Sequence, residues 1–173
     1  MKKEINVWEY AEHIFEKMPK GILLTTKADK KVNSMVIGWG MLGIEWGAPV
    51  FIAYVRKSRY TKELLDKNGE FTVNIPLGDL DKEIFTLCGT KSGRDYDKIA
   101  QLGLTLEEGE TVSVPAIKEL PLTLECKVVY HQDQDPESID PELDNRWYAK
   151  GTAHEGNYHT VYYGQITKAY IVE

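Results

Sequence analysis

Residues Arg56–Thr61 (Arg-Lys-Ser-Arg-Tyr-Thr) combine side chains that are suited to binding a phosphate group. They follow the apolar run Val50–Val55, which predicts a buried strand, and precede Lys62–Asn68, which predicts a short helix ending at Gly69. Two guanidinium groups, two hydroxyl groups and a helix N-terminus are therefore expected within a few residues. The unpaired N–H groups of a helix N-terminus attract anions. The segment indicates either a phosphate site or a capped surface helix with solvated arginines.

The histidines of the chain do not have the spacing of a metal site. They are His13, His131, His154 and His159, and the closest pair is five residues apart without accompanying cysteines. We therefore expect no bound metal. His159 is a candidate catalytic residue, and a structural or solvent-facing role is the alternative.

Neither cysteine shows the context of a catalytic nucleophile. Cys126 alternates with apolar residues and is expected in the core, whereas Cys88 ends a predicted helix beside Gly89, where packing and ligand contact both remain open. The chain has no GxSxG, Walker or GxGxxG sequence, so hydrolase, P-loop and Rossmann sites are not supported. The two cysteines are far apart, and free thiols in a reducing cytoplasm are the simplest interpretation.

Length and charge narrow the class of protein further. A chain of 173 residues is most economically one domain covering 1–173. Its formal net charge of −6, without a basic tract, argues against nucleic-acid binding. The charged, amphipathic N-terminal segment does not resemble a signal peptide, and no apolar run is long enough for a membrane span. We expect a soluble, cytoplasmic protein.

The periodicity of apolar residues predicts a mainly β protein. Strands are expected at 21–27, 32–39, 50–55, 71–75, 122–130 and 159–172, and helices at 8–18, 62–68, 80–87 and 96–102. Asn6 and Asp79 are the predicted caps of the first and third helices. Because strands and helices do not alternate, a barrel or sandwich with helical additions is favoured over a parallel sheet.

Three segments depart from regular periodicity. Four glycines at 38, 40, 43 and 47 are too many for a regular element, and suggest a close backbone approach or a strained bend. Residues 132–145 are acidic and contain proline, which predicts a loop or flexible insertion. In the last strand, Gly164 is a predicted bulge.

Residues 122–130, by contrast, alternate strictly, which indicates a half-buried strand.

Several blocks of sequence together resemble the flavin reductase-like family of FMN-binding split barrels, and most closely its flavoredoxin-type branch. The blocks are VNSMVIGWG (32–40), YVRKSRYTKELL (54–65), GEFTVNIP (69–76), CGTKSGRDYDK (88–98), PLTLECKV (121–128) and YYGQI (162–166). Three of them carry the polar and glycine-containing segments 33–39, 56–61 and 92–98. The likeness covers nearly the whole chain, and the spacing between the blocks also agrees.

The resemblance implies a Greek-key split barrel that forms a homodimer, with one FMN in each protomer near the subunit interface. It also implies the following contacts: backbone groups of Asn33, Ser34, Met35, Val36 and Ile37 at the flavin ring; Arg56, Ser58, Arg59 and Thr61 at the phosphate; and Ser92, Gly93 and Lys98 closing the site. Family members commonly carry threonine at the position of Val36, so one hydroxyl contact is lost here. The acidic segment 132–145 has no clear counterpart in the family.

For function, the resemblance implies an oxidoreductase in which NAD(P)H reduces FMN and the electrons pass to an acceptor. The nicotinamide would meet the flavin directly, so a separate Rossmann fold is not required. A flavoredoxin-type electron carrier, with tightly bound FMN reduced by a partner protein, is the alternative. A non-enzymatic barrel that binds another ligand is a third hypothesis.

Overall fold

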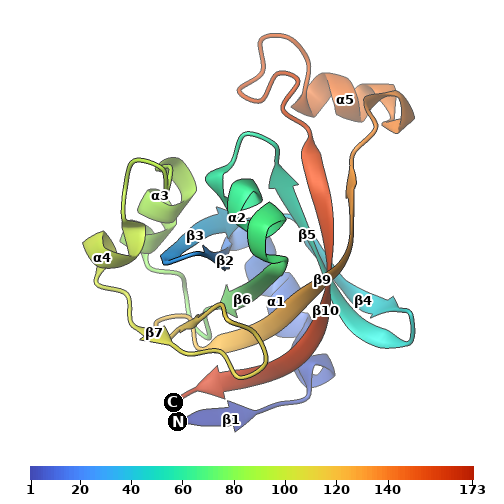
Figure 1. Ribbon diagram of the computed structural model, residues 1–173. Coiled ribbons are helices and arrows are strands. Elements are labelled where there is room, and N and C mark those ends of the chain that lie inside the picture. The colour runs from blue at the N-terminus through green and yellow to red at the C-terminus, as the bar shows by residue number, and fades with distance from the viewer.

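An antiparallel sheet of eight strands curves around the largest group of buried apolar side chains (Figure 1). The computed structural model describes residues 1–173. The strands are β1 (Lys2–Glu4), β2 (Ile22–Ala28), β3 (Lys31–Ile37), β4 (Gly40–Glu45), β5 (Ala48–Arg56), β6 (Glu70–Ile75), β9 (Leu122–Asp133) and β10 (His159–Val172). Their order is β3-β2-β6-β9-β10-β5-β4, with β1 beside β10. Because β3 and β4 end this path and do not pair with each other, the barrel is split along one side.

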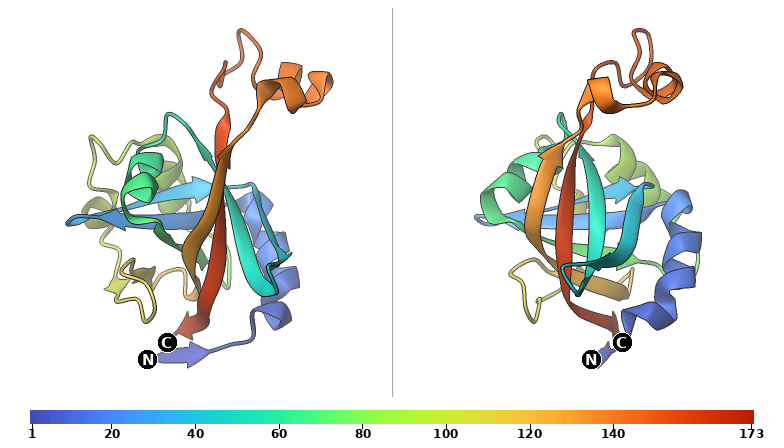
Figure 2. Two further views of the ribbon diagram at one scale, coloured as in Figure 1. Left: turned by 45° about the vertical axis from the view of Figure 1, so that its right-hand side comes forward. Right: turned by 90° about the vertical axis from the view of Figure 1, so that its right-hand side faces the viewer.

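The helices lie outside the sheet and cover part of it (Figure 2). They are η1 (Val7–Tyr10), α1 (Ala11–Lys17), η2 (Met18–Lys20), α2 (Tyr60–Asn68), α3 (Lys82–Thr90), α4 (Lys98–Leu102), η3 (Pro136–Ser138) and α5 (Pro141–Trp147). A short second sheet pairs β7 (Leu106–Glu107) with β8 (Ala116–Ile117). None of the helices is both long and apolar enough to cross a membrane.

Two apolar clusters on opposite faces of β2 explain why this strand is buried almost throughout. Leu24 belongs to the main cluster, which α1 and η2 complete with Ile14 and Met18. Leu23 belongs to a second cluster that includes Ile84 and Cys88 of α3. A strand that is covered on both faces has a nearly continuous apolar sequence, as GILLTTK does. The mainly β fold with helical additions, predicted from the sequence, is confirmed.

Most element boundaries agree with the sequence analysis. Asn6 caps the first helical segment by accepting from the Trp8 backbone N–H, and Gly69 ends α2 in the left-handed conformation. The predicted bulge appears as a register shift between β9 and β10 at Tyr163 and Gly164. The predicted cap of α3 was wrong: Asp81, not Asp79, accepts hydrogen bonds from the first turn of the helix.

The predicted half-buried character of β9 was wrong for its first half. Leu122, Leu124 and Cys126 face the main core, but Thr123 and Glu125 on the opposite face are also fully buried. Glu125 accepts hydrogen bonds from Thr111, from the Glu110 backbone N–H and from Tyr170, so its carboxylate is satisfied. These bonds hold the pKa of Glu125 below its ordinary value although burial alone would raise it. The covering segment 108–114 is distant in sequence, which is why alternation alone did not reveal it.

Part of the glycine-rich segment, residues 40–45, forms a regular strand, contrary to the prediction, whereas the predicted close approach and bend lie at Gly40 and at Trp46 and Gly47. β4 runs through Gly40 and Gly43, and turns into β5 at Trp46 and Gly47, which both have positive φ. Gly40 does show the expected close approach, because a Cβ there would lie 2.8 Å from the ring of Phe51. Gly47 therefore serves the tight turn of the hairpin and Gly40 the close packing, and neither interrupts the strand.

The acidic segment is also more regular than predicted. Strand β9 continues to Asp133, and residues 134–158 form an arm that carries η3 and α5 and projects from the end of β9 and β10 (Figure 1). Asp140 caps α5 by accepting from Glu142 and Leu143 N–H groups, and Pro141 occupies the first turn. An aspartate followed by proline is a typical helix start, so this element was present in the sequence but was missed.

Candidate functional site

The junction between β5 and α2 has the geometry predicted for Arg56–Thr61. β5 ends at Arg56, and Arg59 is the N-cap residue of α2 with no side-chain capping bond. Arg59 is exposed and forms no ion pair. Its guanidinium is therefore free for an anion at the start of α2, where unpaired backbone N–H groups also lie.

Lys98, at the first position of α4, supplies a second unpaired cation. It is only 3% exposed and forms no ion pair. Burial lowers its pKa, and the nearby positive charge of Arg59 lowers it further, while Cys88 acts in the opposite direction. A buried ammonium group without a carboxylate is costly, which points to an anionic partner supplied by a ligand.

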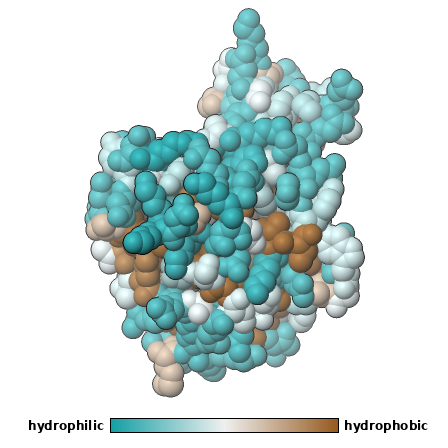
Figure 3. All heavy atoms as spheres, viewed as in Figure 1, coloured by the Kyte–Doolittle hydropathy of each residue, from teal (hydrophilic) through white to brown (hydrophobic).

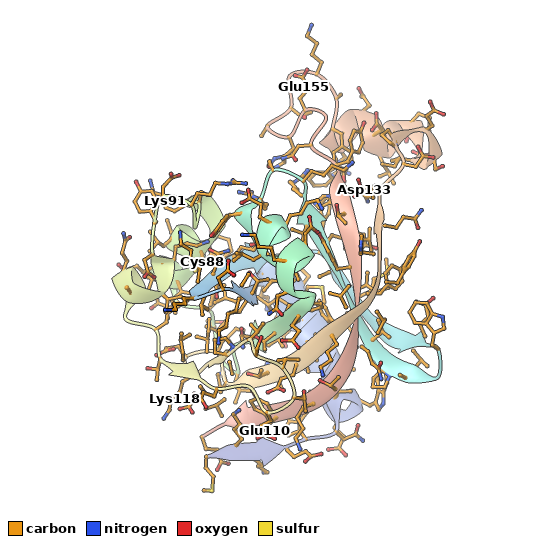
Figure 4. All side chains as sticks on the ribbon, in the orientation of Figure 1. Cys88, Lys91, Glu110, Lys118, Asp133 and Glu155 are labelled. Carbon is orange, nitrogen blue, oxygen red and sulfur yellow. The ribbon has the colours of Figure 1, made fainter.

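Lys98 and Arg59 border one cavity of about 100 Å³, which we call the Lys98 cavity. Residues from β3, the start of α2, α3 and the loop that follows α3 complete its wall. They are Asn33, Met35, Val36, Ser58, Tyr60, Thr61, Cys88, Gly89, Lys91, Ser92, Gly93 and Arg94. Figure 4 labels Cys88, in the last turn of α3 on the side that faces the interior, and Lys91, which directly follows this helix.

The contact between Asn33 and Gly93 shapes the floor of the Lys98 cavity. Asn33 donates to the Thr61 hydroxyl at 3.0 Å, but its Oδ1 atom is buried without a donor. A Cβ atom at Gly93 would lie 2.1 Å from this Oδ1, so only glycine fits here. The close approach brings the backbone of the 91–97 loop against β3 and leaves one acceptor unsatisfied at the cavity wall.

A second cavity, of about 170 Å³, adjoins the first and is called the His159 cavity here. The two share Met35, Val36 and Arg59. The remaining lining residues are Ile37, Gly38, Trp39, Tyr54, Arg56 and His159. Since β3 ends the sheet, one of its edges has no strand partner, and backbone N–H and C=O groups along that edge are available to a ligand.

His159 is a neutral imidazole in this environment. Burial, followed by the positive charge of Arg56, lowers its pKa to about 3. Its Nδ1 lies 2.9 Å from the Tyr148 hydroxyl and 3.2 Å from Gln134 Oε1, whereas Nε2 forms no hydrogen bond within the protein. The ring also lies 5.2 Å from that of Trp39, between centroids. Nε2 of His159 can therefore form one hydrogen bond with a ligand, and the ring remains neutral near neutral pH.

The arm binds two of the side chains that the sequence suggested for phosphate. Asn157 accepts from the Ser58 backbone N–H and donates to the Ser58 hydroxyl at 2.7 Å. Arg56 donates to the Asn157 carbonyl at 2.9 Å, and its guanidinium lies over the rings of Trp39 and Tyr148. Figure 4 places Asp133 at the base of the arm and Glu155 at its tip. The arm is thus joined to the site by hydrogen bonds and by cation–π contacts.

The structure brings nearly all of the predicted site residues to these two cavities. The exception is Ser34, whose hydroxyl lies 2.7 Å from that of Thr25 in a buried polar network and lines neither cavity. Residues that were not among the predicted site residues include Trp39, Tyr54, Tyr60, Asn157 and Tyr148, whereas Cys88, for which both packing and ligand contact were considered, lines the Lys98 cavity. Trp39 could have been found because it lies within the block 32–40, but the arm residues carry no local signal.

The curved antiparallel sheet, with a cation-lined cleft beside its unpaired edge strand β3, defines the class of split β-barrel proteins. The model of the flavin reductase like domain matches residues 15–173, and the chain belongs to this family. An uncharacterized protein of Archaeoglobus fulgidus is 34% identical over 130 residues, which cover 75% of this chain and 69% of that protein.

Two solved flavoredoxins have the same fold. Flavoredoxin of Desulfovibrio vulgaris (Miyazaki F) superimposes with a TM-score of 0.67 at 26% identity, covering 88% of this chain and 69% of its own. Flavoredoxin of Methanosarcina acetivorans superimposes with a TM-score of 0.66 at 29% identity, and the match covers 88% of this chain and 68% of that protein. The family resemblance seen in the sequence is confirmed.

Proposed function

We propose that the protein is an FMN-binding oxidoreductase that passes electrons from NAD(P)H through the flavin to an acceptor. The observation that carries this proposal is Lys98, which is buried, lacks an ion pair and faces the same cavity as Arg59. Unpaired cations, Arg59 and Lys98 among them, and a helix N-terminus suit a phosphate monoester. The adjoining His159 cavity, beside the free edge of β3, suits the ring system of the same ligand.

The residues present fit FMN in their hydrogen-bonding chemistry. Arg59 and Lys98 would hold the phosphate, together with backbone N–H groups at the start of α2. Ser58 and Thr61 already have partners in Asn157 and Asn33, so their hydroxyls would contribute second bonds. The unsatisfied Oδ1 of Asn33 is covered by the Gly93 backbone, and it is the Nδ2 group that holds Thr61 at the cavity wall. Ser92 and Gly93 would close the site from the loop that follows α3.

The chemistry of such a site divides between the cofactor and the protein. FMN supplies hydride and single-electron transfer when it is bound. The residues Met35–Ile37 would orient the ring through the backbone of β3, and Val36 offers no hydroxyl of its own. Neutral His159 would direct Nε2 into the cavity as a hydrogen-bonding group. Trp39 and Tyr54 would exclude water from the ring face beside it.

The absorption spectrum of freshly purified protein tests both parts of the proposal. We expect a flavin spectrum, or quenching of FMN fluorescence on titration, followed by bleaching on anaerobic addition of NADH or NADPH. A protein that fails to bind FMN would contradict the cofactor assignment. FMN binding without oxidation of either nicotinamide would instead contradict the proposed electron donor.

The second candidate function is a flavoredoxin-type electron carrier. It is favoured by the likeness to two flavoredoxins above 25% identity. Such a protein would retain FMN through gel filtration and would be reduced by a partner redox protein while remaining inert to NAD(P)H. Loss of flavin on desalting would favour a reductase that treats FMN as a substrate. A colourless protein that does not quench FMN fluorescence would favour the third hypothesis, a non-enzymatic binding barrel.

A further inference from the structure

A third and larger cavity, of about 560 Å³, adjoins the Lys98 cavity at the loop that follows α3. The two cavities share Tyr60, Gly93 and Arg94. The third cavity shares no lining residue with the His159 cavity. The three therefore lie in a series, with the Lys98 cavity in the middle, and we call the third one the Tyr96 pocket.

The wall of the Tyr96 pocket combines apolar, aromatic and charged groups. Val32, Ile99 and Leu104 provide apolar surface, and Leu106 lies at the rim with 38% of its surface exposed. Tyr60 and Tyr96 present aromatic rings. An apolar wall with aromatic rings suits a planar heterocycle, because every nucleobase can stack on such a ring.

The charged groups at this pocket suit the remaining parts of a nucleotide. Lys30 and Lys31 form no ion pair, and Lys31 Nζ lies 6.0 Å from the centre of the Tyr60 ring. The side chain of Asp95 forms no hydrogen bond. The side chain of Asp97 caps α4 by accepting a hydrogen bond from the Ala100 backbone N–H. Lysine binds phosphate, and a carboxylate accepts hydrogen bonds from ribose hydroxyls.

We propose that the Tyr96 pocket binds the adenosine phosphate group of a dinucleotide. The inference deepens the proposed function and rests on it for the identity of the neighbouring Lys98 cavity. An adenosine phosphate group can belong to FAD or to the nicotinamide dinucleotide. The serial order of ring cavity, phosphate cavity and Tyr96 pocket matches the order of groups along FAD.

Binding of 5′-AMP, measured by calorimetry on the flavin-free protein, tests the pocket directly. Leu106→Trp places a larger side chain at the rim, and Tyr96→Ala removes one ring. We expect either variant to weaken AMP binding at least tenfold and to leave FMN affinity unchanged. Leu77→Trp changes another exposed leucine, 45% exposed and outside the pocket, and is the matched control.

The source of the adenosine group is decided by comparing four ligands in wild type and Leu106→Trp. If wild type binds FAD more tightly than FMN and Leu106→Trp loses this difference in affinity, the pocket is assigned to FAD. NAD⁺ or NADP⁺ binding that is lost in the variant assigns it to the nicotinamide dinucleotide. Absence of AMP binding, or equal binding by all variants, while FMN binds normally would overturn the inference alone. AMP binding without FMN binding would instead overturn the proposed function.

Discussion

At the scale of single residues, the site is defined by cations that the protein itself does not neutralise. Arg59 and Lys98 border one cavity and neither has a carboxylate partner, although the chain carries more acidic than basic residues. Other lysines do pair with carboxylates, as Lys62 does with Asp66 at 2.8 Å. The charge at the cavity is therefore left for a ligand, at a cost to the stability of the empty protein.

Replacing Arg59 with alanine should weaken FMN binding by about 1.5–3 kcal/mol, the value expected for a lost charge-assisted hydrogen bond. Its side chain has no partner in the protein, so folding should be unaffected. Fluorescence titration with FMN measures the effect. Arg146→Ala, an exposed arginine of α5, is the control with the same change in charge. Equal FMN affinity in both variants would place the phosphate elsewhere.

Lys98→Met should have opposite effects on binding and on stability. Removing a buried, unpaired charge should raise the free energy of unfolding of the flavin-free protein by about 1–2 kcal/mol. FMN affinity should fall at least about tenfold because the phosphate loses a cation. Thermal unfolding and FMN titration of the same preparation separate the two effects. A variant that loses stability but retains FMN affinity would show that Lys98 has a structural role.

The depressed pKa of His159 predicts a loss of stability in acid. The unfolded imidazole titrates near 6.5 and the folded one at about 3, so the unfolded state binds more protons between these values. The contribution of neutral His159 to the free energy of unfolding is fully present above pH 6.5. The free energy of unfolding should fall by about 2 kcal/mol when the pH is lowered to 5. Denaturant unfolding of wild type and His159→Gln at both pH values measures this. A pH dependence that persists unchanged in the variant would contradict the assignment.

The same residue bears on turnover. Because His159 stays neutral at physiological pH, its contribution to NAD(P)H oxidation should not titrate near pH 6.5. His159→Ala should lower turnover by removing the hydrogen-bonding group at the His159 cavity. Unchanged turnover would show that His159 has no catalytic role.

At the scale of elements, the arm (134–158) is a distinctive part of this chain. Trp147 of α5 lies 5.0 Å from Trp39 between ring centroids, and Asn157 bridges to Ser58. These contacts connect the arm to both the ring end and the phosphate end of the site. We infer that the arm holds the β5–α2 junction in place, in addition to shaping the entrance.

Asn157→Ala should release the arm from this junction. It removes two hydrogen bonds to Ser58, and about 1–2 kcal/mol of stability is expected to be lost. Limited proteolysis should cut the arm faster, and FMN affinity should fall because Ser58 loses both of its bonds to Asn157, whereas the bond from Arg56 to the Asn157 backbone carbonyl is kept. Asn145→Ala, an exposed asparagine of α5 without a side-chain hydrogen bond, is the matched control. Identical proteolysis of the two variants would contradict a clamping role.

At the scale of the whole molecule, exposed apolar residues gather on the β4–β5 hairpin and the adjacent part of β9. Ile44 is 73% and Trp46 64% exposed, and Trp46 lies 6.4 Å from Tyr130 of β9 between ring centroids. In Figure 3 the visible face is mainly hydrophilic, with a brown patch on the right at the level where β9 and β10 cross. Exposed apolar and aromatic side chains that gather in this way are typical of a protein interface.

We expect this face to form the homodimer that the family resemblance implies. Ile44→Asp would place a charge in the interface and should convert dimers into monomers, as measured by sedimentation velocity. Leu143→Asp, on the 51%-exposed leucine of α5, is the control and should leave the dimer intact. A wild-type protein that remains monomeric at all concentrations would contradict the prediction.

The elements that could be predicted from the sequence are those whose defining contacts are local in sequence. The first helix, the β2–β3 hairpin and the end of α2 were predicted because a cap, a turn and Gly69 are local signals. The buried outer face of β9 was not predicted, because Glu125 is satisfied by a segment 14 and 15 residues away and by Tyr170. The regular course of β4 was not predicted, because the density of glycines argued against a strand. The reason for a glycine at position 40 is the ring of Phe51 in the neighbouring strand, which leaves no room for a Cβ atom.

The sequence by itself determined the family, through blocks of residues with the right spacing, and it predicted an anion site, through a run of arginines and hydroxyls at a strand–helix junction. Such signals survive without coordinates because they depend on neighbours along the chain. Only the tertiary structure decided which of those groups are free. Arg56 and Ser58 are held by Asn157, which lies 101 and 99 residues away, whereas Arg59 and Lys98 remain unpaired beside one cavity. Hydrogen-bond partners and the cost of desolvation depend on proximity in space, which the order of residues does not contain.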